Sequence, residues 1–386
     1  MRSVMPPCTG ALTVPGLLEQ RATRIVFFIA GLSVAAWAPL VPFAKARTGV
    51  GDGVLGLLLL CLGTGSILSM PLAGTLAARF GCRRVLIVST GIICMCLPLL
   101  ATASRKPLLM AALFIFGAGV GSLDCVVNIQ AVIVERASRR PMMSGFHGLF
   151  SVGGIVGSGG VSALLSMGAS PLASTLCVAG AILGVLVKAA PHLLPYGGER
   201  KGSVFAIPDG PVLFIGILCF VVFLTEAAVL DWSAVFLTST RSVEPAYAGI
   251  AYAAFALTMT VGRLTGDAVV QRIGGGTVVV FGGLCAAAGL TLATLVPVWG
   301  AAILGFALVG AGCSNIVPVL DTAVGRQKAM PEHVAVPAIT TLGYAGILAG
   351  PAMIGLIAHM TSLPIAFLGV AILLVLVAAS GRVLHV

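Results

Sequence analysis

Charge is scarce in this chain of 386 residues, since only 9% of its side chains are Asp, Glu, Lys or Arg. A soluble protein carries roughly 25% charged residues, so there is too little charge here to cover a surface that faces water. Hydrophobic residues make up 59% of the chain, and the mean hydropathy is +1.12. The excess apolar surface must face an apolar medium, and a lipid bilayer is the natural one.

The sequence also lacks the common signatures of nucleotide hydrolysis and metal binding. It contains no Gly-x4-Gly-Lys-Ser/Thr loop, so direct ATP hydrolysis by this chain has no support. The ten cysteines form no Cys-x2-Cys pair, and no group of His, Cys and carboxylates has the spacing of metal ligands. We interpret the cysteines as small core hydrophobes, and we expect no enzyme activity, no cofactor and no metal site.

What is present is a series of apolar runs, each near the roughly 20 residues that cross a bilayer. Twelve such runs fall at 24–44, 53–77, 84–104, 107–134, 143–167, 170–190, 211–236, 247–266, 275–296, 298–325, 335–359 and 362–383. Residues 1–23 contain three prolines and several charges, and they are typical of a cytoplasmic tail rather than a cleavable signal. The polar stretch 191–210 divides the chain into bundles at 24–190 and 211–386. The predicted fold is an all-α membrane protein with two six-helix bundles.

The net charge of +10 has its own explanation in this pattern. In a soluble protein it would suggest binding to nucleic acid, but here the basic residues lie in short segments between apolar runs. With the N-terminus inside, 17 of the 22 Lys and Arg residues are cytoplasmic. This bias predicts cytoplasmic N- and C-termini and a bilayer, not a nucleic acid, as the partner.

The two halves of the chain repeat one another at a fixed offset of half its length. The paired positions are Arg79-Phe80-Gly81 with Arg272-Ile273-Gly274, Gly117 with Gly310, and Gly157 with Gly350. Because three matches at one offset fall in corresponding helices, we predict a duplicated six-helix unit in parallel orientation.

A signature follows the second apolar run, Gly74-Thr-Leu-Ala-Ala-Arg79-Phe-Gly81-Cys-Arg83-Arg84. It resembles the pattern Gly-x3-Asp-Arg-x-Gly-Arg-Arg of the major facilitator superfamily, with Ala78 and Cys82 as departures. Four further stretches resemble the branch near the fucose and glucose/mannose permeases and its uncharacterised bacterial inner-membrane relatives. They are Trp37-Ala-Pro39-Leu-Val-Pro42, Asp124-Cys-Val-Val-Asn128, Phe146-His147-Gly148-Leu-Phe150 and Glu226-x4-Asp231-Trp232-Ser233. The resemblance implies twelve helices around a cavity that opens alternately to each side, often with proton coupling.

Ionisable residues inside a bilayer cost roughly 2.5–3.5 kcal/mol each on insertion scales, so those that occur there should line a cavity or find a partner. Asp124 and Asn128 lie four apart on one helix face, and His147 is expected at a similar depth on the next helix. We interpret these three as a proton or substrate site, with a structural hydrogen-bond cluster as the alternative. Glu226, well inside its run, is a candidate proton carrier or acceptor for a sugar hydroxyl, unless it only bonds the backbone.

Four more residues are candidates to line the cavity. Trp37 could stack on a solute or belong to an outer aromatic belt. Asn315 could bind a polar solute or join helices. Asp231 and Trp232 are expected near the outer interface, where a belt role is favoured for the tryptophan.

Charged residues at the inner ends of helices are candidates for a gate that holds the inner side closed. They are Arg79, Arg83, Glu135, Arg263, Asp267, Arg272 and Asp321. Glu135 is the candidate to replace the acid that is missing at Ala78. The alternative is that the cations among them only set topology.

Together these features favour a proton-coupled secondary transporter for a small polar solute such as a sugar or organic acid, working as a monomer in the bacterial inner membrane. A drug or metabolite efflux antiporter is the first alternative. Little favours it, because Ser158 follows Gly157 where the antiporter signature has proline. A membrane sensor that binds a solute without moving it is the second alternative, although the loops are too short for a signalling domain.

Overall fold

The computed structural model describes residues 15–49, 52–197, 208, 210–244 and 249–382, and within these it contains helices and no strand. The first half comprises α1 (Leu17–Ala35), η1 (Ala38–Leu40), α2 (Val41–Thr48), α3 (Asp52–Phe80), α4 (Cys82–Thr102), α5 (Lys106–Ser138), α6 (Met143–Ser166), α7 (Pro171–Ala189) and η2 (Ala190–His192). The second comprises α8 (Gly210–Arg241), α9 (Ile250–Ile273), α10 (Gly275–Leu295), α11 (Trp299–Cys313), α12 (Ile316–Arg326), α13 (Glu332–Met360) and α14 (Leu363–Ser380). The all-α prediction is confirmed, while residues 1–14 of the predicted tail and most of the predicted central loop lie outside the described residues.

Eleven of the described segments are long and apolar enough to cross a membrane, and α9 is the remaining long helix of the predicted twelve. Its mean hydropathy is too low for a typical membrane span, because it carries Arg263, Asp267 and Arg272. Two predicted runs are broken helices: the first continues through η1 and α2, and the tenth is divided between α11 and α12. The first helix also begins at Leu17, earlier than predicted, where the Glu19 carboxylate accepts the backbone N–H of Gly16 at 2.7 Å.

The structure confirms the internal duplication in detail. Gly81 and Gly274 precede α4 and α10 with nearly the same backbone angles, φ +86° and ψ 153° against φ +80° and ψ 150°. Gly117 and Gly310 permit equivalent close crossings, because an added Cβ would lie 2.0 Å from the Leu62 carbonyl oxygen in the first case and 2.2 Å from that of Phe255 in the second. The two residues that these glycines meet, Leu62 and Phe255, are therefore separated along the sequence by the same half-chain offset as the two glycines.

These crossings give a stability prediction. Gly117→Ala should destabilise the protein by about 1–3 kcal/mol, since the new methyl group overlaps the α3 backbone. The matched control is Gly91→Ala in α4, where an added Cβ meets nothing within 4 Å and the better helix propensity of alanine should make the change neutral or slightly stabilising. Thermal unfolding in detergent measures both. Equal melting temperatures for the two variants would contradict the close crossing.

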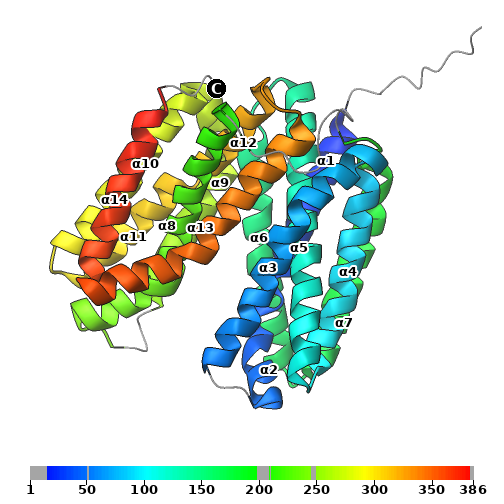
Figure 1. Ribbon diagram of the computed structural model, residues 1–386, viewed down its shortest axis with the longest axis horizontal. Coiled ribbons are helices and arrows are strands. Elements are labelled where there is room, and N and C mark those ends of the chain that lie inside the picture. The colour runs from blue at the N-terminus through cyan, green and yellow to red at the C-terminus, as the bar shows by residue number, and fades with distance from the viewer. Residues whose placement is uncertain (1–14, 50–51, 198–207, 209, 245–248, 383–386) are drawn as a thin grey trace, which may run out of the picture.

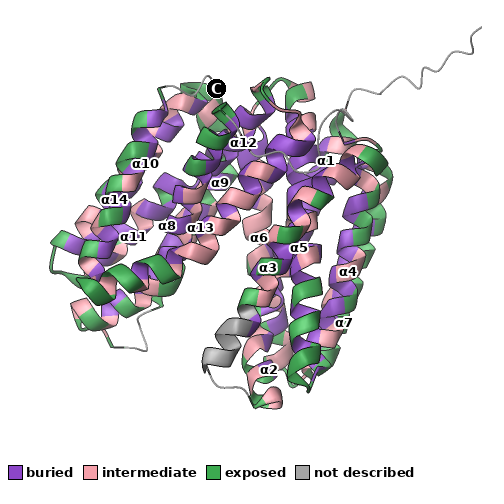
Figure 2. Cartoon of the chain, viewed as in Figure 1, coloured by how far each residue is buried: buried purple, intermediate pink, exposed green. Residues whose placement is uncertain are grey.

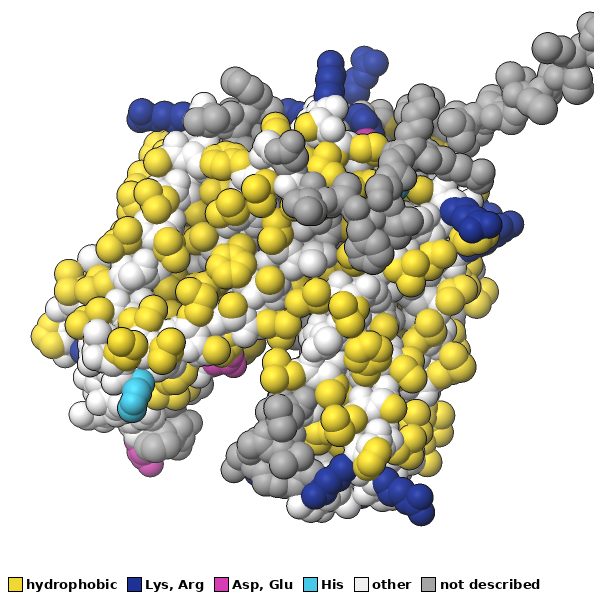
Figure 3. Space-filling view, viewed as in Figure 1, with side chains coloured by type: hydrophobic (Ala, Val, Ile, Leu, Met, Phe, Trp, Pro, Cys, Tyr) yellow, Lys and Arg dark blue, Asp and Glu magenta, His cyan; other side chains and the backbone are white. Residues whose placement is uncertain are grey.

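The two bundles lie side by side, in contact on the side where α1 begins and α14 ends and apart on the opposite side (Figure 1). We call these the terminal face and the open face. A cleft enters between the halves from the open face in the space-filling view (Figure 3). Apolar side chains cover the flanks, and Lys and Arg gather at the two ends, as expected for a protein that spans a bilayer. Buried residues face one another between the helices, and exposed ones lie outside (Figure 2).

Candidate functional site

A cavity of about 160 Å³ lies between the two halves. Helices α5 and α6 line it from the first half, and α8, α9, α12 and α13 line it from the second. Its polar lining consists of Asp124, Asn128, His147, Glu226, Arg263, Asp321, Thr340 and Tyr344. The duplicated architecture therefore brings most of the chain's intramembrane charge to one place.

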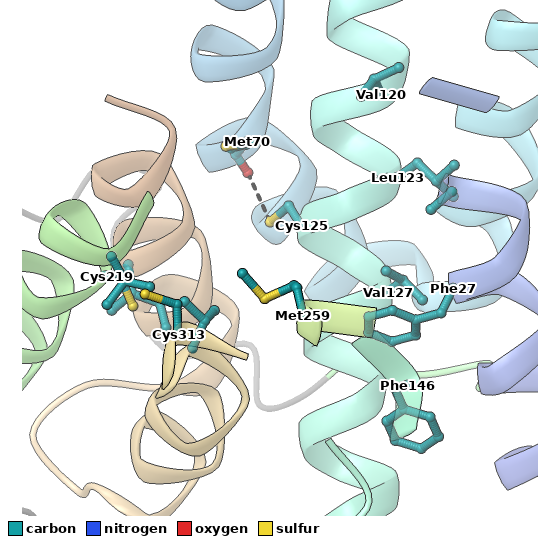
Figure 4. Packing of buried hydrophobic residues seen from close by; sticks show 14 of the residues in the cluster. Phe27, Met70, Val120, Leu123, Cys125, Val127, Phe146, Cys219, Met259 and Cys313 are labelled. Carbon is teal, nitrogen blue, oxygen red and sulfur yellow. Dashed lines mark hydrogen bonds between the residues drawn. The ribbon is translucent and has the colours of Figure 1, made fainter. Parts of the chain in front are cut away.

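One pair in this cavity joins the two halves. His147 Nε2 of α6 lies 3.1 Å from Asp321 Oδ2 of α12, and the side chains are only 12% and 6% exposed. The Phe27 ring of α1 stacks on Phe146 of α6 (Figure 4). The same ring lies 5.2 Å from the imidazole and restrains the histidine from the side of α1. The pair is an ion pair when His147 is protonated and a hydrogen bond when it is neutral.

The structure corrects the predicted placement of Asp321 at the inner end near Arg326, while its role as a gate residue stays a prediction. Counting along an unbroken run placed it towards the inner end. In the structure α12 is a separate short helix that packs against α5, α6 and α8, so the carboxylate reaches the cavity at the seam between the halves.

A second pair links Glu226 of α8 to Arg263 of α9, with Arg263 Nη2 3.2 Å from Glu226 Oε1. Arg263 Nη1 also donates to Ser151 Oγ of α6 at 3.2 Å, so the guanidinium reaches the first half as well. This placement corrects the prediction of Arg263 as a residue at the inner end. It lies about 15 Å along the axis from Ile273, where α9 ends.

The structure brings Asp124 and Asn128 to the same cavity as His147, in the arrangement that their spacing indicated. Asp124 makes its side-chain contact with Tyr344 of α13, and among the described residues it forms no ion pair with Lys or Arg. Asn128 Nδ2 donates to the Asp124 backbone oxygen at 2.9 Å, and its Oδ1 has no hydrogen-bond partner among the described residues. Whether these side chains bind a proton or a solute stays a prediction.

Trp37 and Asn315 do not line this cavity. Trp37 lies at the break between α1 and η1, only 5% exposed, which excludes a lipid-facing belt position. Asn315 lies at the break between α11 and α12, and its Nδ2 donates to the Gly262 backbone oxygen of α9 at 3.0 Å. The structure therefore supports the helix-joining alternative for the asparagine.

Trp232 and Asp231 are also outside the cavity lining. The Trp232 indole N–H donates to the Pro351 backbone oxygen at 3.2 Å and ties α8 to α13. Asp231 is exposed beside Trp232, so this residue is available as a control for substitutions in the cavity.

At the terminal face, helix ends of the two halves are joined by several contacts, and the predicted gate residue Glu135 takes part in them. Arg136 of α5 forms an ion pair with Glu332 at the start of α13. Thr322 of α12 donates to Glu135 Oε1 at 2.5 Å. Glu135 Oε2 accepts the backbone N–H groups of Met142 and Met143 at 2.7 Å each, which caps the start of α6. Glu135 thus bridges the halves, through a hydroxyl and not through the arginines of the signature.

Arg83 of the signature serves the first half alone. It donates to the backbone oxygens of Pro191 and Leu193 and so fastens the segment after α7 to the start of α4. Arg83 was predicted as a gate residue, but these contacts join two parts of its own bundle. Arg79 lies over the Phe80 ring, with its Cζ 5.1 Å from the ring centroid.

Besides Arg263, Asp267 of α9 also approaches the other bundle. Its carboxylate faces the backbone N–H groups of Ser144 and Gly145 in the first turn of α6, a position where a helix attracts negative charge. Arg272 is exposed near the end of α9. Of the residues predicted as gates, Glu135 and Asp267 thus lie at contacts between the halves, beside the Arg136–Glu332 pair, and their role in gating stays a prediction.

The Arg136–Glu332 pair predicts a conformational effect. Glu332→Gln should raise the equilibrium constant for opening of the terminal face by roughly two- to five-fold, because a partly exposed pair contributes about 0.5–1 kcal/mol. Spin labels at Arg105→Cys and Val298→Cys, in a background in which Cys8, Cys61, Cys177 and Cys285 are replaced by Ser, report the change as a shorter distance across the open face. Glu244→Gln removes an exposed acid that follows α8 and forms no ion pair among the described residues, and it should change nothing. Equal shifts in both variants would exclude the Arg136–Glu332 pair as a latch.

Comparison with known proteins gives one consistent family. The family model described as Major Facilitator Superfamily matches residues 25–241. An uncharacterized MFS-type transporter of Yersinia pestis is 55% identical over 369 residues, which cover 95% of this chain and 96% of the relative. Membrane protein MosC of Rhizobium meliloti is 32% identical over 97% of this chain and 92% of its own. The crystal structure of the E. coli fucose:proton symporter matches with a TM-score of 0.80 and 15% identity, covering 96% of this chain and 99% of that one.

Proposed function

The chain belongs to the Major Facilitator Superfamily, and from this membership we propose that it is a proton-coupled secondary transporter that carries a small polar solute through the cavity between its halves. The observation that carries the proposal is the polar seam inside this cavity. His147–Asp321 and Arg263–Ser151 each join one half to the other. A change of the side to which the cavity opens must therefore break them.

The lining favours a neutral, hydroxylated solute such as a sugar over an organic acid. It presents three carboxyl groups, from Asp124, Glu226 and Asp321, against one guanidinium and one imidazole, so an anionic solute would meet repulsion. Phe150 and Phe223 also line the cavity, and aromatic rings pack well against the apolar faces of a sugar ring. The volume lies below the roughly 300–1,000 Å³ of pockets for drug-sized ligands, which argues against bulky efflux substrates.

Asp124 is the carboxyl group that we assign to proton coupling. Glu226 and Asp321 already have cationic partners or a histidine, whereas Asp124 has the Tyr344 hydroxyl. Binding and release of a proton at Asp124 changes the charge of the cavity by one unit without first breaking an ion pair. A carrier can use this charge change to link proton movement to the movement of solute.

From the charge bias we infer that the terminal face, where α1 begins and α14 ends, lies on the cytoplasmic side. The open face then looks outward from a bacterial inner membrane, and we interpret the arrangement of the halves as the outward-open state of a transporter that works as a monomer. The membrane assignment agrees with the bacterial source of the relatives.

A ligand panel on purified protein tests the proposal, since a ligand stabilises the state that it binds. Sugars and polyols should raise the melting temperature, and the same compounds should exchange across the membrane of proteoliposomes. Stabilisation by organic anions or bulky amphipathic compounds alone would contradict the proposed solute class. Saturable binding without exchange would support the sensor alternative instead.

A further inference from the structure

A second cavity, of about 320 Å³, opens at the terminal face and is separate from the central one. The end of α5 and the connection to α6 line it from the first half, and the end of α12 lines it from the second. Four arginines surround it, namely Arg136, Arg139, Arg140 and Arg326. Basic residues on this face are expected from topology alone, but topology does not require arginines from both halves to converge on one hollow.

Most of this positive charge has no carboxylate partner. Glu332 pairs with Arg136, and the Glu135 carboxylate is occupied by Thr322 and backbone N–H groups. Arg140 donates to the neutral Gln20 Oε1 at 3.0 Å. Among the described residues, Arg139, Arg140 and Arg326 form no ion pair, so three like charges face a shared cavity and repel one another.

The cavity depends on closure of the terminal face. The ends of α5 and α12 are in direct contact beside it, because an added Cβ at Gly325 would lie 2.4 Å from Val132 Cγ1. If the halves separated at this face, Arg326 would move away from Arg139 and Arg140, and the cavity would lose one wall.

We propose that this cavity binds an anion of the phosphate class, and that the anion holds the terminal face closed. Guanidinium groups bind phosphate oxygens in bidentate geometry, and an anion here would contact Arg139 and Arg140 on one half and Arg326 on the other. It would replace repulsion across the seam with attraction on both sides. A dissolved phosphate compound and the headgroup of an anionic lipid share this chemistry. Binding itself does not require transport, whereas the locking effect rests on the alternating access proposed above.

Distance measurements with the spin-label pair on Arg105→Cys and Val298→Cys test the proposal in two arms. In nanodiscs of phosphatidylcholine, millimolar pyrophosphate should increase the population with a wide open face. In nanodiscs that contain phosphatidylglycerol, with no added phosphate, the same increase should appear if the source is lipid. An increase in either arm supports the anion site and identifies its source. No increase in both arms overturns the proposal.

Variants assign the effect to the cavity. Arg139→Gln/Arg326→Gln should weaken the response to the effective anion by about tenfold or more, because two charged hydrogen-bonding groups are removed. Lys328→Gln, which removes an exposed cation two residues from Arg326 and outside the lining, should respond like the parent. Arg326→Lys keeps the charge and should retain most of the response. Binding at this cavity would be contradicted if the double variant responded like the parent, or if the double variant and Lys328→Gln lost the response equally. Solute exchange by the same preparations shows whether the transporter itself is intact.

Discussion

Asp124→Asn is expected to abolish proton-driven accumulation of the solute. The substitution keeps the size of the side chain and its contact with Tyr344, but it removes the group that we assign to carry the proton. Exchange of solute between the two sides without net proton movement should persist, because the cavity and its inter-half contacts remain. Uptake driven by a pH gradient, compared with solute exchange in the same proteoliposomes, separates the two processes.

Asp231→Asn is the matched control for this variant. It makes the same chemical change at an exposed carboxyl group outside the cavity lining and should leave both uptake and exchange intact. If Asp124→Asn accumulates solute as the parent does, Asp124 does not couple protons. If exchange and uptake fail together in a folded protein, its role is in solute binding and not in coupling.

Arg263→Gln is expected to produce the largest loss of stability among substitutions in the site. The Arg263 side chain is 9% exposed and pairs with Glu226, which is 21% exposed. Removal of one partner of a buried pair costs about 3–5 kcal/mol, because the remaining charge loses its compensation. The same change also removes the contact with Ser151 of the first half, so transport should be lost.

The double variant Glu226→Gln/Arg263→Gln distinguishes an electrostatic cause from a packing cause. With both charges removed, most of the stability should return, while transport stays absent because the link between the halves is gone. Chemical unfolding of the parent, both single variants and the double variant gives the coupling energy directly. A double variant that is less stable than Arg263→Gln would contradict a dominant charge-pair contribution.

The fold was predictable because its signals are local or strictly periodic. Apolar runs near membrane length gave the helices, and matching glycines such as Gly117 and Gly310 gave the duplication that the helix crossings confirm. The break near Pro39 agrees with the bend that Pro39 and Pro42 favour, whereas the break after Cys313 was not predicted, because apolar composition continues through it. The early start at Leu17 was missed because the first turns of α1 are polar and charged.

The candidate site was predictable only in part. Asp124 and Asn128 share a helix face by their spacing, and the depth estimate for His147 placed it correctly among them. Asp321 and Arg263 were predicted at the inner ends of helices, and that placement was wrong. A depth counted from the end of an apolar run becomes less accurate over ten residues and across a helix break. The latch between Arg136 and Glu332 joins residues far apart in sequence, and neither belongs to the signature that directed attention to Arg79 and Arg83.

Simultaneous measurement of solute and proton movement in proteoliposomes tests the central claim most directly. With a stabilising sugar or polyol outside and no pH gradient, the account predicts that solute entry is accompanied by proton entry, and that Asp124→Asn shows neither net proton movement nor accumulation. Solute entry without any proton movement in the parent protein would contradict the coupling that the cavity is proposed to perform.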